Sequence, residues 1–225
     1  MQRYLTSSKY IDFEDAEITA LAAELAQGAT SEHELVRRCF GFVRDEIRHS
    51  ADFKLNPVTC KASDVLRHRT GFCYAKSHLL AALLRANGIP TGLCYQRLSV
   101  HDSGPAYCFH GLNAVYLQNI GWYRIDARGN KQGVSAEFDP PREALAFLVR
   151  EPQERDLPEI WAEPLPIVVE VLERYTSHDE VFANLPDVEL TISLDVSAVS
   201  ACALGPSRAG SAAESICSLT SGLSL

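Results

Sequence analysis

The chain has 225 residues, of which 46% are hydrophobic and 22% are charged, close to the average for globular proteins. A chain of this length can bury a sizeable core, so fibrous and wholly disordered classes are excluded. Its net charge is −8 and it has no basic tract, so we expect no nucleic-acid partner and no membrane partner. No apolar run approaches the roughly 20 residues that a membrane-spanning helix needs.

The seven cysteines indicate a reduced setting rather than a disulfide scaffold. Their number is odd, their spacing shows no repeated framework, and the first residues contain no apolar stretch typical of a secretion signal. We therefore expect a cytoplasmic protein. No CxxC pair is present, although Cys108 and His110 form a C-x-H pair. A structural zinc site that uses Cys94, Cys108 and His110 stays open as an alternative.

Helical spacing of apolar residues dominates the first part of the chain. It predicts a helix whose apolar residues recur over about 18–25 and whose end is marked by Gly28. Ser31 and Glu34 form a capping-box pattern, with the serine capping the helix and the glutamate reaching back. This pattern predicts an amphipathic helix that continues to about His49.

The stretch 70–90 is the most informative part of the sequence. It is rich in Ala and Leu from Cys73 to Ala86, which predicts a buried helix that begins at the cysteine. Gly71 would permit a tight turn just before it. Gly88 supplies a left-handed stop, and Pro90 prevents the helix from resuming.

Strands are predicted after this helix, and the far end of the chain changes in character. A turn pattern separates the first two strands, and Asn119–Gly121 is a plausible hairpin between the second and the third. Residues 201–225 are rich in Ser and Ala, lack periodicity and predict a flexible tail after a single domain over 1–200. The remaining expected segments are strands at 91–100, 109–118 and 122–127, a strand or short helix at 144–149, and helices at 164–175 and 179–185.

Three residues suggest a nucleophilic site: Cys73 at a helix start, His110 on a strand, and Asp126 on the next strand. The positive end of a helix and a neighbouring imidazolium both favour the thiolate, the reactive form of a cysteine. The histidine then protonates a leaving amine, and the carboxylate orients the histidine. A hairpin about 119–121 would leave Asp126 about four positions from the residue opposite His110, so spacing alone does not establish the pair.

These residues resemble the transglutaminase-like superfamily, whose members are relatives of papain-like cysteine peptidases. The resemblance spans roughly residues 35–185 and rests on three blocks in the order Cys, His, Asp. The blocks are Gly71-Phe72-Cys73 with the helix that it opens, His110-Gly111-Leu112-Asn113-Ala114-Val115-Tyr116, and Gly121-Trp122-Tyr123-Arg124-Ile125-Asp126. Just after the histidine, this chain has Gly111-Leu112-Asn113 where family members commonly show a Trp or Glu.

The resemblance implies an α+β, papain-like architecture in which the cysteine helix packs on an antiparallel sheet. It also implies a catalytic triad of Cys73, His110 and Asp126 in a cysteine-dependent amide hydrolase or acyl transferase, with peptidase or amidase chemistry favoured. The substrate would be a peptide, a protein or a small amide. No acidic cluster resembles the calcium sites of animal transglutaminases, so we expect no cofactor and no metal. The backbone N–H of Cys73 is a natural oxyanion donor, and Gln96 is a candidate for the second.

Two functional alternatives stay open. A catalytically silent binding domain would keep the fold without the reaction, because fold does not guarantee activity. A protein-crosslinking transglutaminase would transfer the acyl group to an amine rather than to water. The sequence specifies neither the acyl acceptor nor the oligomeric state.

Overall fold

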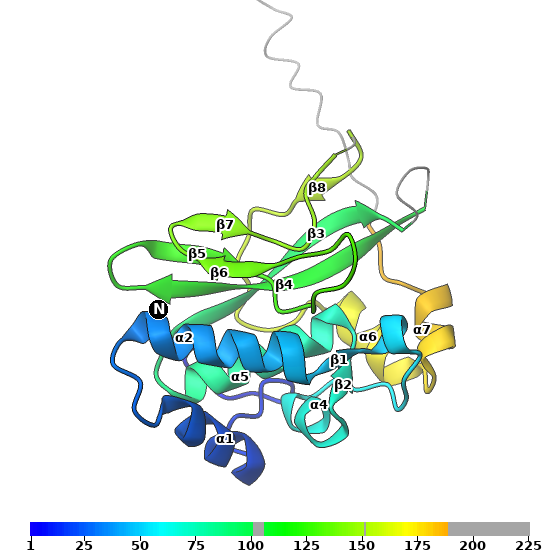
Figure 1. The fold of residues 1–225 in the computed structure, drawn as a ribbon. Coiled ribbons are helices and arrows are strands. Elements are labelled where there is room, and N and C mark those ends of the chain that lie inside the picture. Colours follow the sequence, from blue (N-terminus) through cyan, green and yellow to red (C-terminus); the bar gives the residue numbers. More distant parts are fainter. Residues whose placement is uncertain (101–105, 151, 189–225) are drawn as a thin grey trace, which may run out of the picture. The chain divides into compact units, whose positions relative to one another are not determined.

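A computed structural model describes residues 1–100, 106–150 and 152–188 of the chain. Its sheets and helices are mixed along the sequence (Figure 1). The helical elements are η1 (Gln2–Tyr4), α1 (Ala16–Ala26), α2 (Glu32–Gly41), η2 (Phe42–Glu46), α3 (Ser50–Phe53), α4 (Ala62–His68), α5 (Cys73–Ala86), α6 (Pro166–Arg174) and α7 (His178–Ala183). The strands are β1 (Arg48–His49), β2 (Thr70–Gly71), β3 (Thr91–Ser99), β4 (Tyr107–Leu117), β5 (Gly121–Ile125), β6 (Glu137–Asp139), β7 (Arg142–Ala144) and β8 (Arg155–Asp156).

The central sheet is antiparallel, with the strand order β5-β4-β3-β8. Helix α5 packs against β3 and β4, and α1, α2 and α4 pack against α5 (Figure 1). The helices thus gather on one side of the sheet, and the apolar core lies between these two layers. This arrangement is the α+β architecture that the sequence predicts.

Helix α5 is the centre of this core. It spans Cys73–Ala86 as predicted, and every side chain from Cys73 to Arg85 is buried. Its buried residues cover the whole circumference, which is typical of a helix enclosed by other elements. Asn87 caps the C-terminus, and Gly88 follows with a positive φ of 74°. The left-handed stop expected at this glycine is therefore present.

Lys76 is a buried charge within α5, with only 1% of its surface exposed. Its amino group donates to the carbonyl oxygens of Ile47 and Arg44, the latter at 3.4 Å. Burial lowers the pKa of this amine from 10.5 to about 7. The lysine therefore joins the cysteine helix to the segment that leads into β1.

The β4–β5 hairpin differs slightly from the expected register. Leu117 lies opposite Gly121, and Asn113 lies opposite Ile125. Gly121 has a positive φ of 87°, a conformation that glycine adopts without strain. Continuing this register past the end of β5 leaves Asp126 only two positions from the residue opposite His110, rather than four.

Three local expectations were wrong in detail. The amphipathic helix ends early, because α2 passes into a π-helical turn at Phe42–Glu46 and then into β1. The Glu34 carboxylate reaches back to the backbone N–H of Thr30 rather than to that of Ser31. Gly71 lies in β2 rather than in a tight turn. Close packing explains this glycine, because an added Cβ would lie 3.2 Å from atoms of Ala75 and Thr59.

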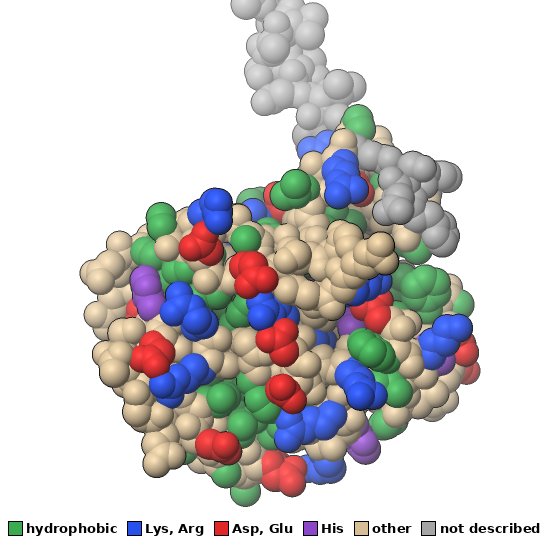
Figure 2. All heavy atoms as spheres, in the orientation of Figure 1, with side chains coloured by type: hydrophobic (Ala, Val, Ile, Leu, Met, Phe, Trp, Pro, Cys, Tyr) green, Lys and Arg blue, Asp and Glu red, His purple; other side chains and the backbone are tan. Residues whose placement is uncertain are grey.

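Parts of the sequence-based interpretation fall outside the described residues. These are the tail predicted at 201–225, the domain end predicted at 200, and most of the turn between β3 and β4. In the part of the chain that the structure describes, no helix has the length and apolarity needed to cross a bilayer. On the face shown in Figure 2, basic and acidic side chains are interspersed with hydrophobic ones.

Candidate active site

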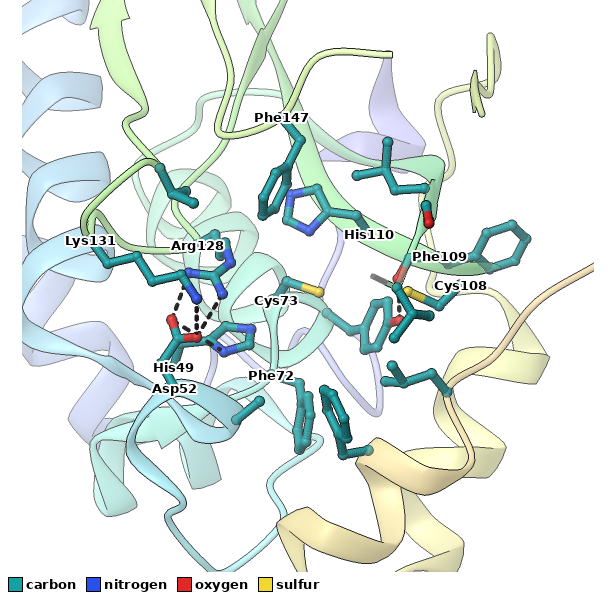
Figure 3. Close-up of a pocket in the computed structure, with 18 of the residues that line it drawn as sticks. His49, Asp52, Phe72, Cys73, Cys108, Phe109, His110, Arg128, Lys131 and Phe147 are labelled. Carbon is teal, nitrogen blue, oxygen red and sulfur yellow. Dashed lines mark hydrogen bonds and ion pairs between the residues drawn. The ribbon is translucent and has the colours of Figure 1, made fainter. Parts of the chain in front are cut away.

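Cys73 is the first residue of α5, and its side chain lines a pocket of about 640 Å³ (Figure 3). The N-cap residue, Phe72, makes no side-chain hydrogen bond to the first turn of the helix. The first N–H groups of a helix have no partner within the helix and carry its positive partial charge. The sulfur of Cys73 therefore lies beside a positive helix end, with 7% of the residue exposed.

The backbone of β4 reaches the sulfur directly. The N–H of Gly111 donates to Sγ of Cys73 over 3.4 Å. Such an approach requires glycine, because a Cβ at position 111 would lie 3.0 Å from Cα of Tyr74. The Tyr74 hydroxyl donates to the carbonyl of Phe109 and holds the helix start against the strand. The glycine that follows His110 thus has a packing reason.

His110 and Asp126 form a buried pair beside Cys73. Nε2 of His110 donates to Oδ2 of Asp126 over 2.7 Å, and the residues are 5% and 0% exposed. The Asp126 carboxylate also accepts the backbone N–H groups of Arg128 (3.0 Å) and Ala146 (3.1 Å). Figure 3 shows the His110 ring next to the sulfur of Cys73, and the Cys73 side chain contributes to raising the pKa of His110. The structure thus brings together the three residues singled out in the sequence.

The two ionisable partners stabilise each other's charge. Burial would lower the pKa of His110. The charges of Asp126 and Cys73, together with the interactions of the ring with both side chains, outweigh burial and raise this pKa well above its ordinary value. Burial would raise the pKa of Asp126, but the charge of His110 and hydrogen bonds from His110, Arg128 and Ala146 lower it. His110 is therefore held as an imidazolium over an extended pH range, with Asp126 as its carboxylate partner.

Phe147 covers the histidine ring. Its ring meets that of His110 edge to face, with the centroids 5.0 Å apart and an interplanar angle of 88°. The residue lies in the 144–149 segment, of which only Ala144 belongs to a strand. Sequence periodicity did not single it out, because an irregular segment has no repeat that distinguishes a functional side chain.

A charged cluster forms another wall of the pocket (Figure 3). Arg128 binds Asp52 through two hydrogen bonds of 2.6 and 2.8 Å, and Lys131 binds it over 2.7 Å. Burial would raise the pKa of Asp52, but the hydrogen bonds from Arg128 and Lys131 lower it to about 2. His49 lies next to this cluster and also lines the pocket. None of these four residues stood out in the sequence, because Asp52 and Arg128, which join the two parts of the cluster, lie 76 positions apart along the chain.

Two further sequence-based assignments do not fit the geometry: Gln96 as an oxyanion donor, and Cys94, Cys108 and His110 as zinc ligands. The amide nitrogen of Gln96 donates to Asp156 (2.9 Å) and to the carbonyl of Phe147 (3.3 Å), so it is engaged elsewhere. Cys94 lies opposite Leu112 on the paired strands β3 and β4, whereas Cys108 lies opposite Leu98. Among the described residues, no three His, Cys, Asp or Glu side chains are grouped as ligands of one metal ion. The zinc alternative therefore loses its ligand set.

Comparisons with solved structures found several similar chains. A protein from Cytophaga hutchinsonii described as a candidate cysteine protease matches at 21% identity with a TM-score of 0.45, over 56% of this chain and 40% of that one. The periplasmic domain of TgpA from Pseudomonas aeruginosa matches at 22% identity with a TM-score of 0.43, over 56% and 46% of the two chains. Red sea bream transglutaminase matches at 12% identity with a TM-score of 0.42, over 52% and 27%. Each match thus spans less than half of the other chain.

The family comparison gives the clearer result. No curated protein matches the sequence. Residues 19–127, however, match the model of the transglutaminase-like superfamily. This range includes Cys73, His110 and Asp126, and it runs from α1 to the end of the β4–β5 hairpin. Residues 19–127, which carry these three side chains, therefore belong to the transglutaminase-like superfamily.

Proposed function

We propose that the protein is a cysteine-dependent enzyme that breaks amide bonds through a thioester, with Cys73, His110 and Asp126 as its catalytic triad. The observation that carries this proposal is the 2.7 Å hydrogen bond from His110 to Asp126 beside a cysteine at a helix N-terminus. The helix end and the imidazolium both favour a thiolate, which is the nucleophilic form. The pocket of about 640 Å³ gives a substrate access to the sulfur.

Acylation follows from the positions of the groups. The thiolate of Cys73 attacks the carbonyl carbon, and a C–S bond forms while the carbonyl electrons move to oxygen. The oxyanion then collapses, the C–N bond breaks, and the imidazolium of His110 gives its proton to the departing amine. The product is a thioester on Cys73 and a neutral histidine that Asp126 keeps in orientation.

Deacylation reverses these roles. Neutral His110 takes a proton from water as the water attacks the thioester carbonyl. The second tetrahedral intermediate collapses, the C–S bond breaks, and the acid leaves while Cys73 returns to the thiolate form. An amine in place of water would give a new amide, which is the transferase outcome. We favour hydrolysis of a peptide, protein or small amide, and the cytoplasmic location stays a prediction.

The reaction can be tested with p-nitrophenyl acetate, an activated ester that acylates nucleophilic cysteines. We expect rapid p-nitrophenolate release and an acetyl adduct that peptide mapping places on Cys73. The Cys73→Ala variant should lose both. The matched control is Cys108→Ala, because Cys108 lines the same pocket but is not part of the triad, and it should keep both.

A second part of the experiment distinguishes hydrolysis from acyl transfer and from a catalytically silent binding domain. Adding a primary amine such as glycine amide to the acetylated enzyme should leave mainly acetate if water is the preferred acceptor. Mainly N-acetylglycine amide would identify a transferase. Acetylation of wild type no faster than that of Cys73→Ala would contradict the proposal and favour the silent binding domain.

A further inference from the structure

A second histidine lines the same pocket as Cys73 and His110. His49 is 8% exposed, and Figure 3 shows its ring between the Asp52 carboxylate and Cys73. The triad does not use it. A buried polar ring beside a reactive sulfur needs an explanation, because unpaired polar groups are costly to bury.

The fold places His49 at the start of the cysteine helix. Strands β1 and β2 pair in parallel, and His49 lies opposite Gly71, two residues before Cys73. The ring also packs edge to face on Phe72, the N-cap of α5, with the centroids 5.8 Å apart. His49 is therefore fixed beside the helix end whose first N–H groups have no partner within the helix.

The ring nitrogens of His49 are not satisfied by the protein. Nδ1 is buried without a hydrogen-bond partner. The nearest carboxylate oxygen, Oδ2 of Asp52, is 3.8 Å away, beyond hydrogen-bond range. That carboxylate is already bound by Arg128 and Lys131. Within the described residues Nε2 also has no hydrogen-bond partner, and unlike Nδ1 it is not fully buried, so it is open to the pocket.

The surroundings keep this imidazole neutral and favour a negative charge beside it. Burial and the charge of Arg128 hold the pKa of His49 well below its ordinary value, with Lys76 and His110 acting in the same direction and Asp52 opposing them. A neutral imidazole carries one N–H. No hydrogen bond fixes that proton on Nδ1, so Nε2 is free to carry it toward the pocket.

We propose that His49 is the second oxyanion donor, with its Nε2–H and the backbone N–H of Cys73 together holding the negative oxygen of each tetrahedral intermediate. The inference rests on the thioester mechanism proposed above. His49 gives up no proton in either step; it donates a hydrogen bond to the oxygen as the C–S bond forms and as it breaks. Neutral imidazoles held beside a helix N-terminus polarise carbonyl groups in this way in other enzymes.

The test compares two reactions of Cys73 in the full-length chain. Acetylation by p-nitrophenyl acetate and the following hydrolysis each pass through an oxyanion, whereas alkylation by iodoacetamide is a displacement that creates none. In His49→Phe, which keeps a ring on Phe72, we expect acetylation and deacetylation to slow by about 100-fold or more. The alkylation rate should stay within about twofold of wild type, because the substitution leaves the thiolate of Cys73 unchanged.

Two conservative variants identify the nitrogen. The amide of His49→Gln reaches about as far as Nε2 and should restore most of the acetylation rate, whereas His49→Asn places its amide near Nδ1 and should not. This comparison does not depend on the Phe variant being folded. The matched control is His78→Phe, since His78 is also fully buried with an unpartnered Nε2 but lies outside the pocket lining. It should leave the ratio of acetylation to alkylation unchanged.

Each other result overturns the inference. Equal loss of the alkylation and acetylation rates would show that His49 stabilises the thiolate instead of the oxyanion. Loss of deacetylation alone would make it a base for the incoming water. A variant with wild-type rates would leave it without a role. These results differ from failure of the proposed function, in which wild-type Cys73 itself would not be acetylated.

Discussion

Nε2 of His110 and Oδ2 of Asp126 lie 2.7 Å apart although the two residues are not directly opposite each other on β4 and β5. Asp126 follows the last residue of β5, and the hairpin register makes it a diagonal neighbour of His110. Diagonal neighbours in a sheet are within reach of long side chains. Two further N–H groups, from Arg128 and Ala146, fix the carboxylate in this position.

This pair predicts the effect of Asp126→Asn. In wild type burial would lower the pKa of His110, but the charges of Asp126 and Cys73 and the hydrogen bond to Asp126 together outweigh burial and raise it, so the imidazolium persists as the pH rises. Without that charge the pKa falls, and His110 loses its proton at a lower pH than in wild type. We expect iodoacetamide alkylation of Cys73 to slow about tenfold or more near pH 6, and to change much less near pH 9.

The surface variant Asp179→Asn is the control for that experiment. Asp179 also pairs with a histidine, His178 at 3.1 Å, but its side chain is 86% exposed. It should leave the pH–rate curve of Cys73 unaltered. A wild-type curve in Asp126→Asn, with an unchanged circular dichroism spectrum, would remove Asp126 from the site.

Differences among the cysteines predict selective labelling. Burial raises the pKa of Cys39, Cys60, Cys94 and Cys108 to about 12, so these thiols stay protonated near neutral pH. Substoichiometric iodoacetamide near pH 7 should therefore label Cys73 before the other four, as measured by peptide mapping. Cys108 is the strictest comparison, because it is partly exposed and lines the same pocket. Earlier labelling of Cys108 would contradict the thiolate assignment.

Close packing at Gly111 predicts a costly substitution. The Cβ of Gly111→Ala would meet Tyr74 at 3.0 Å and push β4 away from the start of α5. Overpacking of this kind costs about 1–3 kcal/mol. That cost lowers Tm by roughly 2–12 °C in a chain of this size.

Gly41 offers the matched control in α2. Nothing lies within 4 Å of a Cβ added there, and alanine is the better helix former. Thermal unfolding followed by circular dichroism should show a Tm for Gly41→Ala equal to or above that of wild type. Equal Tm values for Gly111→Ala and wild type would show that the strand can shift without cost.

Burial of Lys76 predicts how stability depends on pH. The pKa of its amine is about 7 in the folded state and 10.5 as the ordinary value. Between these values the unfolded chain binds the extra proton, so this residue makes stability rise with pH. Lys76→Met should remove that contribution, about 1.4 kcal/mol for each pH unit in the window.

Tm measured from pH 7 to 10 in wild type and Lys76→Met tests this sign. The difference between the two proteins should shift in favour of wild type as the pH increases. Lys131→Met is the comparison, because the side chain of Lys131 is 47% exposed. A constant difference between wild type and Lys76→Met would mean that Lys76 stays charged in the folded protein.

Local patterns in the sequence predicted the elements that carry Cys73, His110 and Asp126. The Ala- and Leu-rich run gave the bounds of α5, and the hairpin signal at 119–121 gave the pairing of β4 with β5. The predicted hairpin register differs from the observed one by two positions, which was enough to leave the His110–Asp126 contact open. A side-chain contact depends on register and on the path of the chain after the strand, and neither has a local signature.

The residues around the triad were not predictable for a related reason. His49 reaches the site through a two-residue parallel pairing with β2, and Phe147 reaches it from an irregular segment. The cluster of Asp52 with Arg128 joins residues 76 positions apart. Such contacts are set by tertiary packing, which periodicity and capping rules do not describe.

Because the Gly111 amide donates a hydrogen bond to the Cys73 sulfur, its NMR signal reports the ionisation state of that sulfur. An N–H that donates to sulfur is deshielded more strongly when the sulfur is a thiolate than when it is a thiol, because charged acceptors form stronger hydrogen bonds. The amide resonance of this one glycine would therefore follow the ionisation of Cys73 in a nitrogen-15-labelled sample. The same resonance would shift again if the proposed thioester forms, so the thiol, thiolate and acylated forms of Cys73 could be distinguished without any substrate chromophore.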